Sequence, residues 1–452
     1  MSQAASPTQT TAPASAFETD HDAFVTAQPA PAWVAALRTE GLASFRALGL
    51  PSSRDEDWLY TNVRPLARGH FPPAPASVHP PTSLAAHRFA LGLEEGPRLV
   101  FLNGRYEASL SSTAELPAGV HVTNLAACRD RGALEALGSV AQAVKHPFVA
   151  LNQAYLDDAA LVHVEAGTVV HAPIQILFLH TPTGDPVAVH PRILVVAEQG
   201  SDVTIVERYG IDCIGALAGG TCLTNAVSEY VLGANARVRT VRVQREGTRT
   251  YHLGFTGVRQ ARDSHFQSTS VSLGGAIDRN EVRAHLDAEG AENHLAGLYV
   301  ISDEEHCDNH TVVHHHVPHG TSRQLFKGIL AGQARGAFTG RVVVDKGAQK
   351  TSAEQANHNL LLSQKAVAET RPQLEIYADD VQCAHGATIG RLDVDALNYL
   401  RSRGIGKTEA RNLLVHAFAR EITEAAGDAR IGEGLDALLA ARLAPSSEGT
   451  QA

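Results

Sequence analysis

The pattern of hydrophobic and polar positions changes twice along the chain. Between residues 33 and 48 apolar side chains recur at helical spacing, and Pro51 ends that pattern. From about residue 161 the pattern becomes a series of short runs rich in β-branched residues, bounded by Gly, Asp or Asn. Helical spacing returns after residue 391. We therefore expect a mainly β protein with a helical region on each side.

The β region contains a repeat. Gly167, Gly200 and Gly233 are 33 residues apart and each lies beside a strand run, although the spacing fails at position 266, which is Phe. A period of this size indicates a stacked array. Many short strands with regular turns favour a β-solenoid or a β-sandwich, and periodicity alone does not choose between them. The clearest strand runs are residues 174–179, 193–196, 203–206 and 238–243.

These patterns divide the chain into four segments. Residues 1–32, rich in Ala, Pro, Ser and Thr, are expected to form a disordered tail. Residues 33–157 form a mostly helical region with a proline-rich linker and a hairpin turn at Asn103-Gly104. Residues 158–390 hold the β core, and residues 391–452 form a C-terminal helical unit. Three apolar stripes mark that unit: Val394, Leu397 and Leu400; Leu413, Leu414, Ala417, Phe418 and Ile422; and Leu435, Leu438 and Leu439.

Length and charge exclude several classes of protein. The chain has 452 residues, enough for a sizeable core, and a net charge of −10, which argues against nucleic-acid binding because that needs a basic footprint. No apolar run reaches the ~18 residues that cross a bilayer. The N-terminus has no secretory-signal pattern, and no Lys or Arg precedes Arg38, which argues against a mitochondrial transit peptide. A cytoplasmic location without a membrane or nucleic-acid partner is expected.

The cysteines indicate free thiols. Their number is odd, their spacing is wide and no C-x-x-C pair occurs, which fits a reducing compartment better than a disulfide framework. No self-contained four-cysteine cluster site is present, so a cluster would need ligands from outside this chain. The five cysteines are Cys128, Cys213, Cys222, Cys307 and Cys383.

Cys383 and His385 form the most informative pair. They are two residues apart, so in an extended backbone both side chains lie on one face. A soft sulfur beside a borderline nitrogen suits iron, zinc or copper and does not suit magnesium or calcium. Two ligands do not complete a tetrahedral site, so the remaining ligands must come from elsewhere in the chain or from a second chain.

A histidine run is the second metal candidate. Cys307 and His310 have ligand-like spacing, and His314 and His316 share a strand face. Histidine-rich tracts bind metal readily. A polar turn or a partner-facing strand is the favoured interpretation, and a metal site is the alternative. The run consists of His306, Cys307, His310, His314, His315, His316 and His319.

Two further motifs are expected to carry no chemistry. Asp379 and Asp380 are adjacent, and neighbours in a strand point to opposite faces, so a turn is expected instead of a shared ion. The sequence GIGKT, which starts at Gly404, looks like a phosphate-binding loop, but Arg401 stands where the first glycine is needed. The expected structure is a helix end at Gly404 and a new helix capped by Thr408, with no nucleotide site.

The stretch RPQLEIYADDVQCAHGATIG at residues 371–390 resembles the SufB/SufD family of iron–sulfur cluster assembly proteins, and the resemblance extends over about 353–422. The run RDEDWLYT at residues 54–61 is similar to the N-terminal signature of the SufD branch. Its Trp58 and Tyr60 are expected to anchor the N-terminal region on the core. The resemblance implies a right-handed parallel β-helix, which decides between solenoid and sandwich.

The resemblance also implies partners and roles. It implies a non-catalytic scaffold subunit that assembles with a SufB-like paralogue, a SufC-like ABC ATPase and, indirectly, a cysteine desulfurase system. His385 and Cys383 would be interface ligands for iron or for a transient iron–sulfur cluster shared with the paralogue. A flavin at the level of the whole complex is left open. The helices over residues 392–422 would dock the ATPase. The implied docking residues are Tyr399, Leu400, Arg401, Arg403, Leu413 and Phe418.

Two alternatives fit the same sequence. A β-helix enzyme that acts on carbohydrate would need a groove lined with acidic and aromatic side chains, and only 5% of the residues are aromatic. The SufB paralogue itself is the other alternative. It should carry more cysteines than these five, and the run at residues 54–61 indicates the SufD branch instead.

Overall fold

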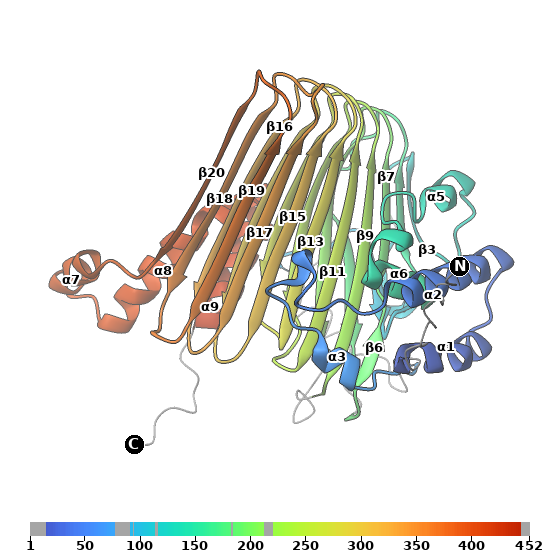
Figure 1. Cartoon of the computed structure of the whole chain (residues 1–452), viewed down its shortest axis with the longest axis horizontal. Helices are drawn as coiled ribbons and strands as arrows, with labels where there is room; N and C mark the ends of the chain where they lie inside the picture. Colours follow the sequence, from blue (N-terminus) through green and yellow to red (C-terminus); the bar gives the residue numbers. More distant parts are fainter. Residues whose placement is uncertain are drawn as a thin grey trace, which may run out of the picture.

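The chain folds into two long β-sheets between which it passes back and forth (Figure 1). The computed structural model describes residues 15–76, 91–93, 95–113, 116–181, 184–211 and 220–443. In the central part, consecutive strands alternate between the sheets and each pairs in parallel with the strand two places away in the chain. This arrangement is a parallel β-solenoid with helices at its N- and C-terminal sides, which confirms the expected fold class.

The strands of each sheet lie side by side in a fixed spatial order. Sheet A comprises β19 (Val367–Ile376), β17 (Arg335–Val344), β15 (His306–His315), β13 (Ile277–Leu286), β11 (Thr250–Gln260), β9 (Cys222–Leu232), β7 (Arg192–Ala197), β4 (Ala160–Val164) and β3 (Val120–Asn124), with β6 (Val187–Val189) paired to β9. Sheet B comprises β2 (Arg105–Tyr106), β1 (Arg98–Leu102), β5 (Ile174–His180), β8 (Asp202–Ile211), β10 (Arg237–Arg245), β12 (His265–Ser272), β14 (Glu292–Ile301), β16 (Thr321–Leu330), β18 (Ser352–Leu361) and β20 (Gln382–Gly390).

The repeat of glycines corresponds to successive turns of the solenoid. Gly167 and Gly200 lie at corners with φ of 71° and 69°, where a residue without Cβ is favoured. The repeat then fails because the turns shorten. Arg237 of β10 pairs with Asp202 of β8 and with His265 of β12, so one turn takes 35 residues and the next takes 28. The side chains between the sheets form the core, in which Phe266, Val313, Phe326 and Phe338 are buried.

The N-terminal helices pack at the first turns of the solenoid, and one of them was not expected. Helix α1 covers residues 16–27, inside the segment that composition assigned to a disordered tail; residues 1–14 lie outside the described chain. Phe17 and Phe24 explain the difference, because both are buried against Phe45 and Tyr155. The helical elements of the N-terminal region are α1 (Ala16–Ala27), α2 (Ala32–Leu48), η1 (Glu56–Trp58), α3 (Arg64–Arg68), η2 (Ala108–Leu110), α5 (Arg131–Ala136), η3 (Ala143–Lys145) and α6 (Pro147–Ala154). Of these, η1 lies farther along the solenoid, where Asp57 contacts β13, β15 and β17.

The other features of the N-terminal region agree in part with the predictions made from the sequence. Strands β1 and β2 form the predicted hairpin, in which Asn103 and Gly104 both have positive φ. Strand β1 also pairs with β5, so the region over residues 33–157 contributes strands to the solenoid and no sharp boundary follows it. The proline-rich linker is ordered at Ala74, whose amide bonds the Ala188 carbonyl, while residues 77–90 lie outside the described chain.

The C-terminal unit consists of α7 (Val394–Ser402), α8 (Lys407–Glu424) and α9 (Ala429–Leu443). Helices α8 and α9 pack on the outer face of sheet B, and α7 projects beyond the body of the molecule (Figure 1). Gly404, with φ of 88°, ends α7 as predicted. The cap of α8 was predicted wrongly, because the helix starts at Lys407 after Gly406 and Thr408 lies inside it.

The predicted stripe on α8 is also displaced from the buried face. Leu413 is 47% exposed, and Ile422 is the only residue of that stripe which is fully buried. The register of a helix against a sheet depends on which side chains fit the outer surface, and apolar spacing does not specify that surface. The buried face of α8 consists of Ala410, Val415, Ala419, Ile422 and Thr423.

Candidate functional site

The C-terminal end of the solenoid is formed by two edge strands. Within the described residues, β19 ends sheet A with β17 as its only neighbour, and β20 ends sheet B with β18 as its only neighbour. Almost every residue of β20 is exposed, and β19 is half-buried along its length. Each strand therefore has one row of backbone N–H and C=O groups that no strand among the described residues pairs.

Cys383 and His385 lie on β20 and share one face. The parallel register places Cys383 beside Ala353 and His385 beside Gln355. Ala353 and Gln355 are buried and point between the two sheets. Because side chains in paired strands follow the same pleat, Cys383 and His385 point toward the interior side of the last turn. No further turn covers them in the described chain, so His385 is exposed and Cys383 is half-buried.

The chemistry of this pair is that of an incomplete ligand set. Burial raises the pKa of the Cys383 thiol, and the contact with the Ala353 backbone only partly offsets this effect. The thiol is therefore protonated at neutral pH, and a metal ion would have to displace its proton in order to bind. Among the described residues, neither Cys383 nor His385 belongs to a group of three or more His, Cys, Asp or Glu side chains that could hold one metal ion. One sulfur and one nitrogen at an exposed edge can bind a metal only together with donors from another molecule.

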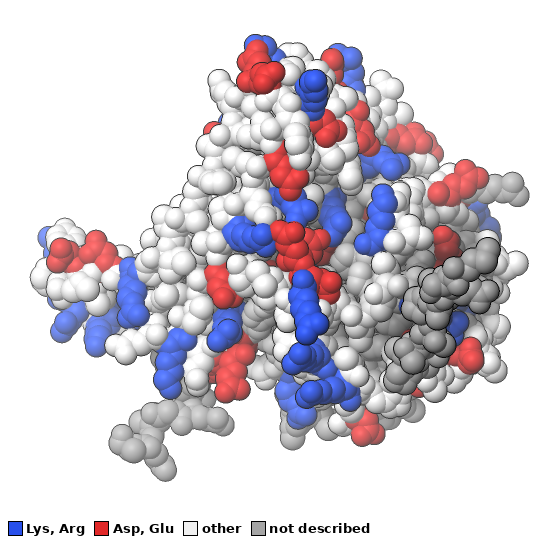
Figure 2. Space-filling view, in the orientation of Figure 1, with Lys and Arg blue, Asp and Glu red and all other residues white. Residues whose placement is uncertain are grey.

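The predicted docking residues form a surface separate from the cysteine–histidine pair. Tyr399 is 63% exposed on α7, and Arg401 and Arg403 are also exposed. Leu413 is exposed on α8. Leu400 of α7 is half-buried. These residues lie on the C-terminal helical unit, whose projecting part carries both acidic and basic side chains in Figure 2.

Phe418 differs from the other docking residues. It is partly buried in the apolar cluster under α8, and the Lys327 ammonium lies 5.0 Å from the centre of its ring. Lys327 also donates to the Phe418 carbonyl at 3.0 Å. These contacts tie Phe418 to sheet B, so its main role here is to hold α8 against the solenoid.

The histidine run does not form one site. Cys307 points into the core and touches Asp278, while His310 points outward and contacts Asp57, so the pair with ligand-like spacing is split between two faces. His315 bonds Ser322 inside the solenoid. The adjacent carboxylates Asp379 and Asp380 lie in a bend, and Asp380 pairs with Lys350, as predicted for a turn.

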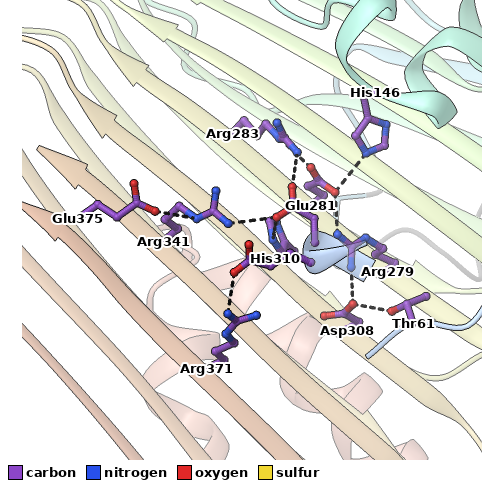
Figure 3. A network of polar contacts seen from close by, with 12 residues as sticks. Thr61, His146, Arg279, Glu281, Arg283, Asp308, His310, Arg341, Arg371 and Glu375 are labelled. Carbon is purple, nitrogen blue, oxygen red and sulfur yellow. Dashed lines mark hydrogen bonds and ion pairs between the residues drawn. The ribbon is translucent and has the colours of Figure 1, made fainter. Parts of the chain in front are cut away.

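A large polar network on the outer face of sheet A was not anticipated (Figure 3). Strands β13, β15, β17 and β19 contribute acidic and basic side chains to it, and the N-terminal segment over residues 54–61 lies across it. Asp57 contacts Arg283 at 3.3 Å and Arg341 at 3.2 Å. The network contains Glu56, Asp57, Thr61, His146, Arg279, Glu281, Arg283, Asp308, His310, Arg341, Arg371 and Glu375.

The electrostatics of this network indicate a structural clamp. Burial alone would raise the pKa of Glu281, but the charges of Arg283, His146 and Arg279 outweigh burial and hold its pKa well below the usual value. Trp58 is buried, and the Arg279 guanidinium lies 4.1 Å from its ring centre. Trp58 thus anchors the N-terminal segment as predicted, whereas Tyr60 is half-buried. The feature of the sequence that could have predicted this network is the run of acidic and aromatic residues at positions 54–61.

Comparison with known proteins agrees with this architecture. A family model described as "SUF system FeS cluster assembly, SufBD core domain" matches residues 179–418, and one for the "SufBD protein N-terminal region" matches residues 15–176. The chain belongs to the SufBD family of iron–sulfur cluster assembly proteins. The two SufBD matches together cover the N-terminal helices, the solenoid, α7 and α8 as far as Phe418, whereas α9 lies beyond the matched residues.

Several curated SufBD relatives are similar over most of their length. An iron–sulfur cluster assembly SufBD family protein of Synechocystis is 37% identical over 84% of this chain and 84% of its own. The iron–sulfur cluster assembly protein SufD of Escherichia coli is 32% identical over 87% of this chain and 89% of its own. SufD of Bacillus subtilis is 28% identical over 86% and 89%. These relatives support the SufD branch, and family membership disfavours a carbohydrate enzyme.

Two further features of this SufBD protein are the charge distribution on one face and the character of its helices. Acidic and basic side chains are interleaved down the middle of the face seen in Figure 2, so no large patch of one sign dominates that face. Within the part of the chain that the structure describes, no helix is long and apolar enough to cross a membrane.

Proposed function

We propose that this chain is a SufD-like scaffold subunit that pairs with a SufB-like paralogue through the end of its solenoid and lends His385 and Cys383 to iron or to a nascent cluster. The observation that carries the proposal is the position of this ligand pair on an unpaired edge strand of the solenoid. The pair is incomplete by itself, and the strand that holds it is ready to accept another strand.

The edge strands themselves favour a partner. Strands β19 and β20 are ten and nine residues long, and long exposed edges are templates for pairing that proteins normally blunt or cover. Pro372 interrupts β19, but β20 contains no proline, lysine or charged residue. A second solenoid that ends in the same way could pair its last strands with these strands, which would bury the backbone groups and bring its own cysteines beside Cys383.

The iron or cluster is the cargo of this site. Thiolate and neutral imidazole suit iron, and the open coordination positions would be filled by sulfide or by residues of the paralogue. Sulfur would come, indirectly, from a cysteine desulfurase system as persulfide. Because His385 must be neutral to bind iron, loading should weaken in acid.

The projecting helix α7 is the proposed dock for a SufC-like ATPase. Its exposed Tyr399, together with Leu413 at the start of α8, offers apolar anchors, and Arg401 and Arg403 surround them with positive charge. The complementary surface would be an apolar groove with an acidic rim. The segment from Gly404 to Thr408 joins two helices and follows no strand, so ATP hydrolysis is assigned to the partner.

Co-expression tests the proposal. The chain is produced with the SufB-like and SufC-like proteins of the same organism and isolated without oxygen, and iron and acid-labile sulfide are measured per complex. The three chains should copurify, and His385→Ala should lose most of the iron at an unchanged yield of complex.

His358→Ala is the matched control, because this imidazole lies on the outer side of the neighbouring strand β18 and bonds Thr388. Normal iron and sulfide in His385→Ala would refute the ligand role, and a wild-type chain that binds neither partner would refute the scaffold role.

A further inference from the structure

Three histidines outside the proposed cluster site converge on the outer face of sheet A. His285 of β13 and His314 of β15 are direct partners in the parallel register, and His316 follows the end of β15. One ligand atom from each of the three lies within 4.8 Å of the others. The rings of His285 and His316 are nearly parallel, with centres 5.5 Å apart. The two strands thus bring together residues that are far apart in the sequence.

A carboxylate orients two of these rings. Asp345, which follows β17, accepts hydrogen bonds from His314 Nε2 at 2.8 Å and from His316 Nδ1 at 2.9 Å. In metal sites the nitrogen that does not bind the metal typically donates to such a carboxylate, which fixes the tautomer. The remaining nitrogens, His314 Nδ1 and His316 Nε2, then carry the lone pairs.

Two of the histidine nitrogens are spaced as metal ligands are. His285 Nδ1 and His316 Nε2 lie 3.1 Å apart and share a hydrogen bond, which a metal ion between the two rings would replace. Two ligands of a tetrahedral zinc ion, at bond lengths of ~2.0–2.1 Å, lie roughly 3.3 Å apart. Asp287 Oδ1 lies 3.7 Å from His316 Nε2 and offers an oxygen for the fourth position. All three imidazoles are half-buried, so solvent can deliver an ion to them.

From this geometry we infer that His285, His314 and His316 bind a zinc-class divalent ion, with Asp345 as the carboxylate that orients two of the ligands and Asp287 as a fourth donor. Three nitrogens and one oxygen select zinc, nickel, cobalt or iron(II) over magnesium and calcium. The ion would connect the ends of β13 and β15, and the hydrogen bonds of Asp345 would join the end of β17 to the site. The site is independent of the proposed function, because it uses neither β20 nor a partner.

Zinc titration of the untagged, full-length chain tests the inference. The chain carries Cys383→Ser and His385→Ala to remove the donors on β20, and is first stripped with a chelator. Calorimetry should show one equivalent of Zn²⁺ bound, and Co²⁺ should give the visible absorption of a tetrahedral site. His316→Asn and His285→Gln should each abolish this equivalent. Asp345→Asn should retain it with an affinity about 10–100-fold weaker, as expected for loss of an orienting carboxylate.

The control is His265→Gln, because this histidine pairs with Glu292 on sheet B, away from the three. It should bind Zn²⁺ like the parent chain, and Zn²⁺ should raise the thermal midpoint of both. Circular dichroism establishes that each variant folds. Zinc binding that survives in both His316→Asn and His285→Gln, or no stoichiometric binding by the folded parent chain, would overturn the inference.

Discussion

At the residue scale, a few charged side chains determine how the N-terminal segment is held. Asp57 joins strands β13 and β17 through Arg283 and Arg341. Contact with His310, reinforced by the charge of Arg283, lowers the pKa of Asp57 from 3.8 to about 2, although burial opposes this shift. A carboxyl with a lower pKa in the folded chain stabilises the fold in its ionised form.

Asp57→Asn should therefore destabilise the protein at neutral pH, by roughly 1–3 kcal/mol for the lost charged hydrogen bonds. The sign follows from the direction of the shift. The stabilisation by the carboxylate is complete above pH ~4 and is lost as the pH falls toward the folded-state pKa of about 2. The difference in thermal midpoint between wild type and variant should thus narrow below pH 4. A constant difference down to pH 2, or an equal loss in the exposed control Glu304→Gln, would contradict this role.

A second prediction at the residue scale concerns the corner glycines. Gly233 packs on the preceding turn, and a Cβ there would lie 2.7 Å from Gln199 N and 2.8 Å from Glu198 C. These are backbone atoms that cannot rotate away, so Gly233→Ala should cost about 1–3 kcal/mol as an overpacked site. Gly347 has no atom within 4 Å of the same position, so Gly347→Ala is the control and should leave stability nearly unchanged. Equal thermal midpoints for the two variants would be inconsistent with this packing.

At the element scale, the sequence predicts where strands occur better than it predicts which elements pack or pair with one another. The β-branched runs and the glycine repeat indicated a stacked array, and the array extends past the point where the repeat fails because the turns shorten from 35 to 28 residues. Helix α1 was missed because composition does not show that Phe17 and Phe24 meet a surface on another element. The pairing of His285 with His314 was missed for the same reason, since it follows from register between turns.

The candidate site was predictable only in part. The two-residue spacing of Cys383 and His385 was enough to place them on one face of a strand. The position of that strand at an edge depends on where the solenoid ends, which spacing does not reveal. The opposite faces of Cys307 and His310 could have been read from their three-residue spacing once the segment was taken as a strand.

Helix α7 yields a prediction at the same scale. Tyr399→Asp and Leu413→Asp should abolish copurification with the SufC-like ATPase, because each places a charge where an apolar anchor would be desolvated. Both positions are exposed, so folding and pairing with the SufB-like paralogue should be unaffected. Arg420→Ala is the control, since this residue is exposed on α8 and pairs along the helix with Glu424. Retention of the ATPase by both aspartate variants would show that it docks elsewhere.

At the scale of the whole molecule, the solenoid has one covered end and one open end. The N-terminal helices and the antiparallel strands β2 and β3 close the first turns. The last turn ends in β19 and β20 without a covering element among the described residues. A parallel array stabilises each turn by its neighbours, so the final turn lacks half of the contacts that the inner turns have. A partner that continues the array would supply them.

Hydrogen–deuterium exchange of β20, with and without the SufB-like paralogue, tests this account most directly. In the free chain the backbone amides of Gln382–Gly390 that do not bond β18 should exchange quickly. In the complex they should become protected, together with those of Val367–Ile376, while the outer surface of β13 and β15 is unchanged. Formation of the complex with no added protection in β20 would contradict the claim that the paralogue completes this edge and its ligand set.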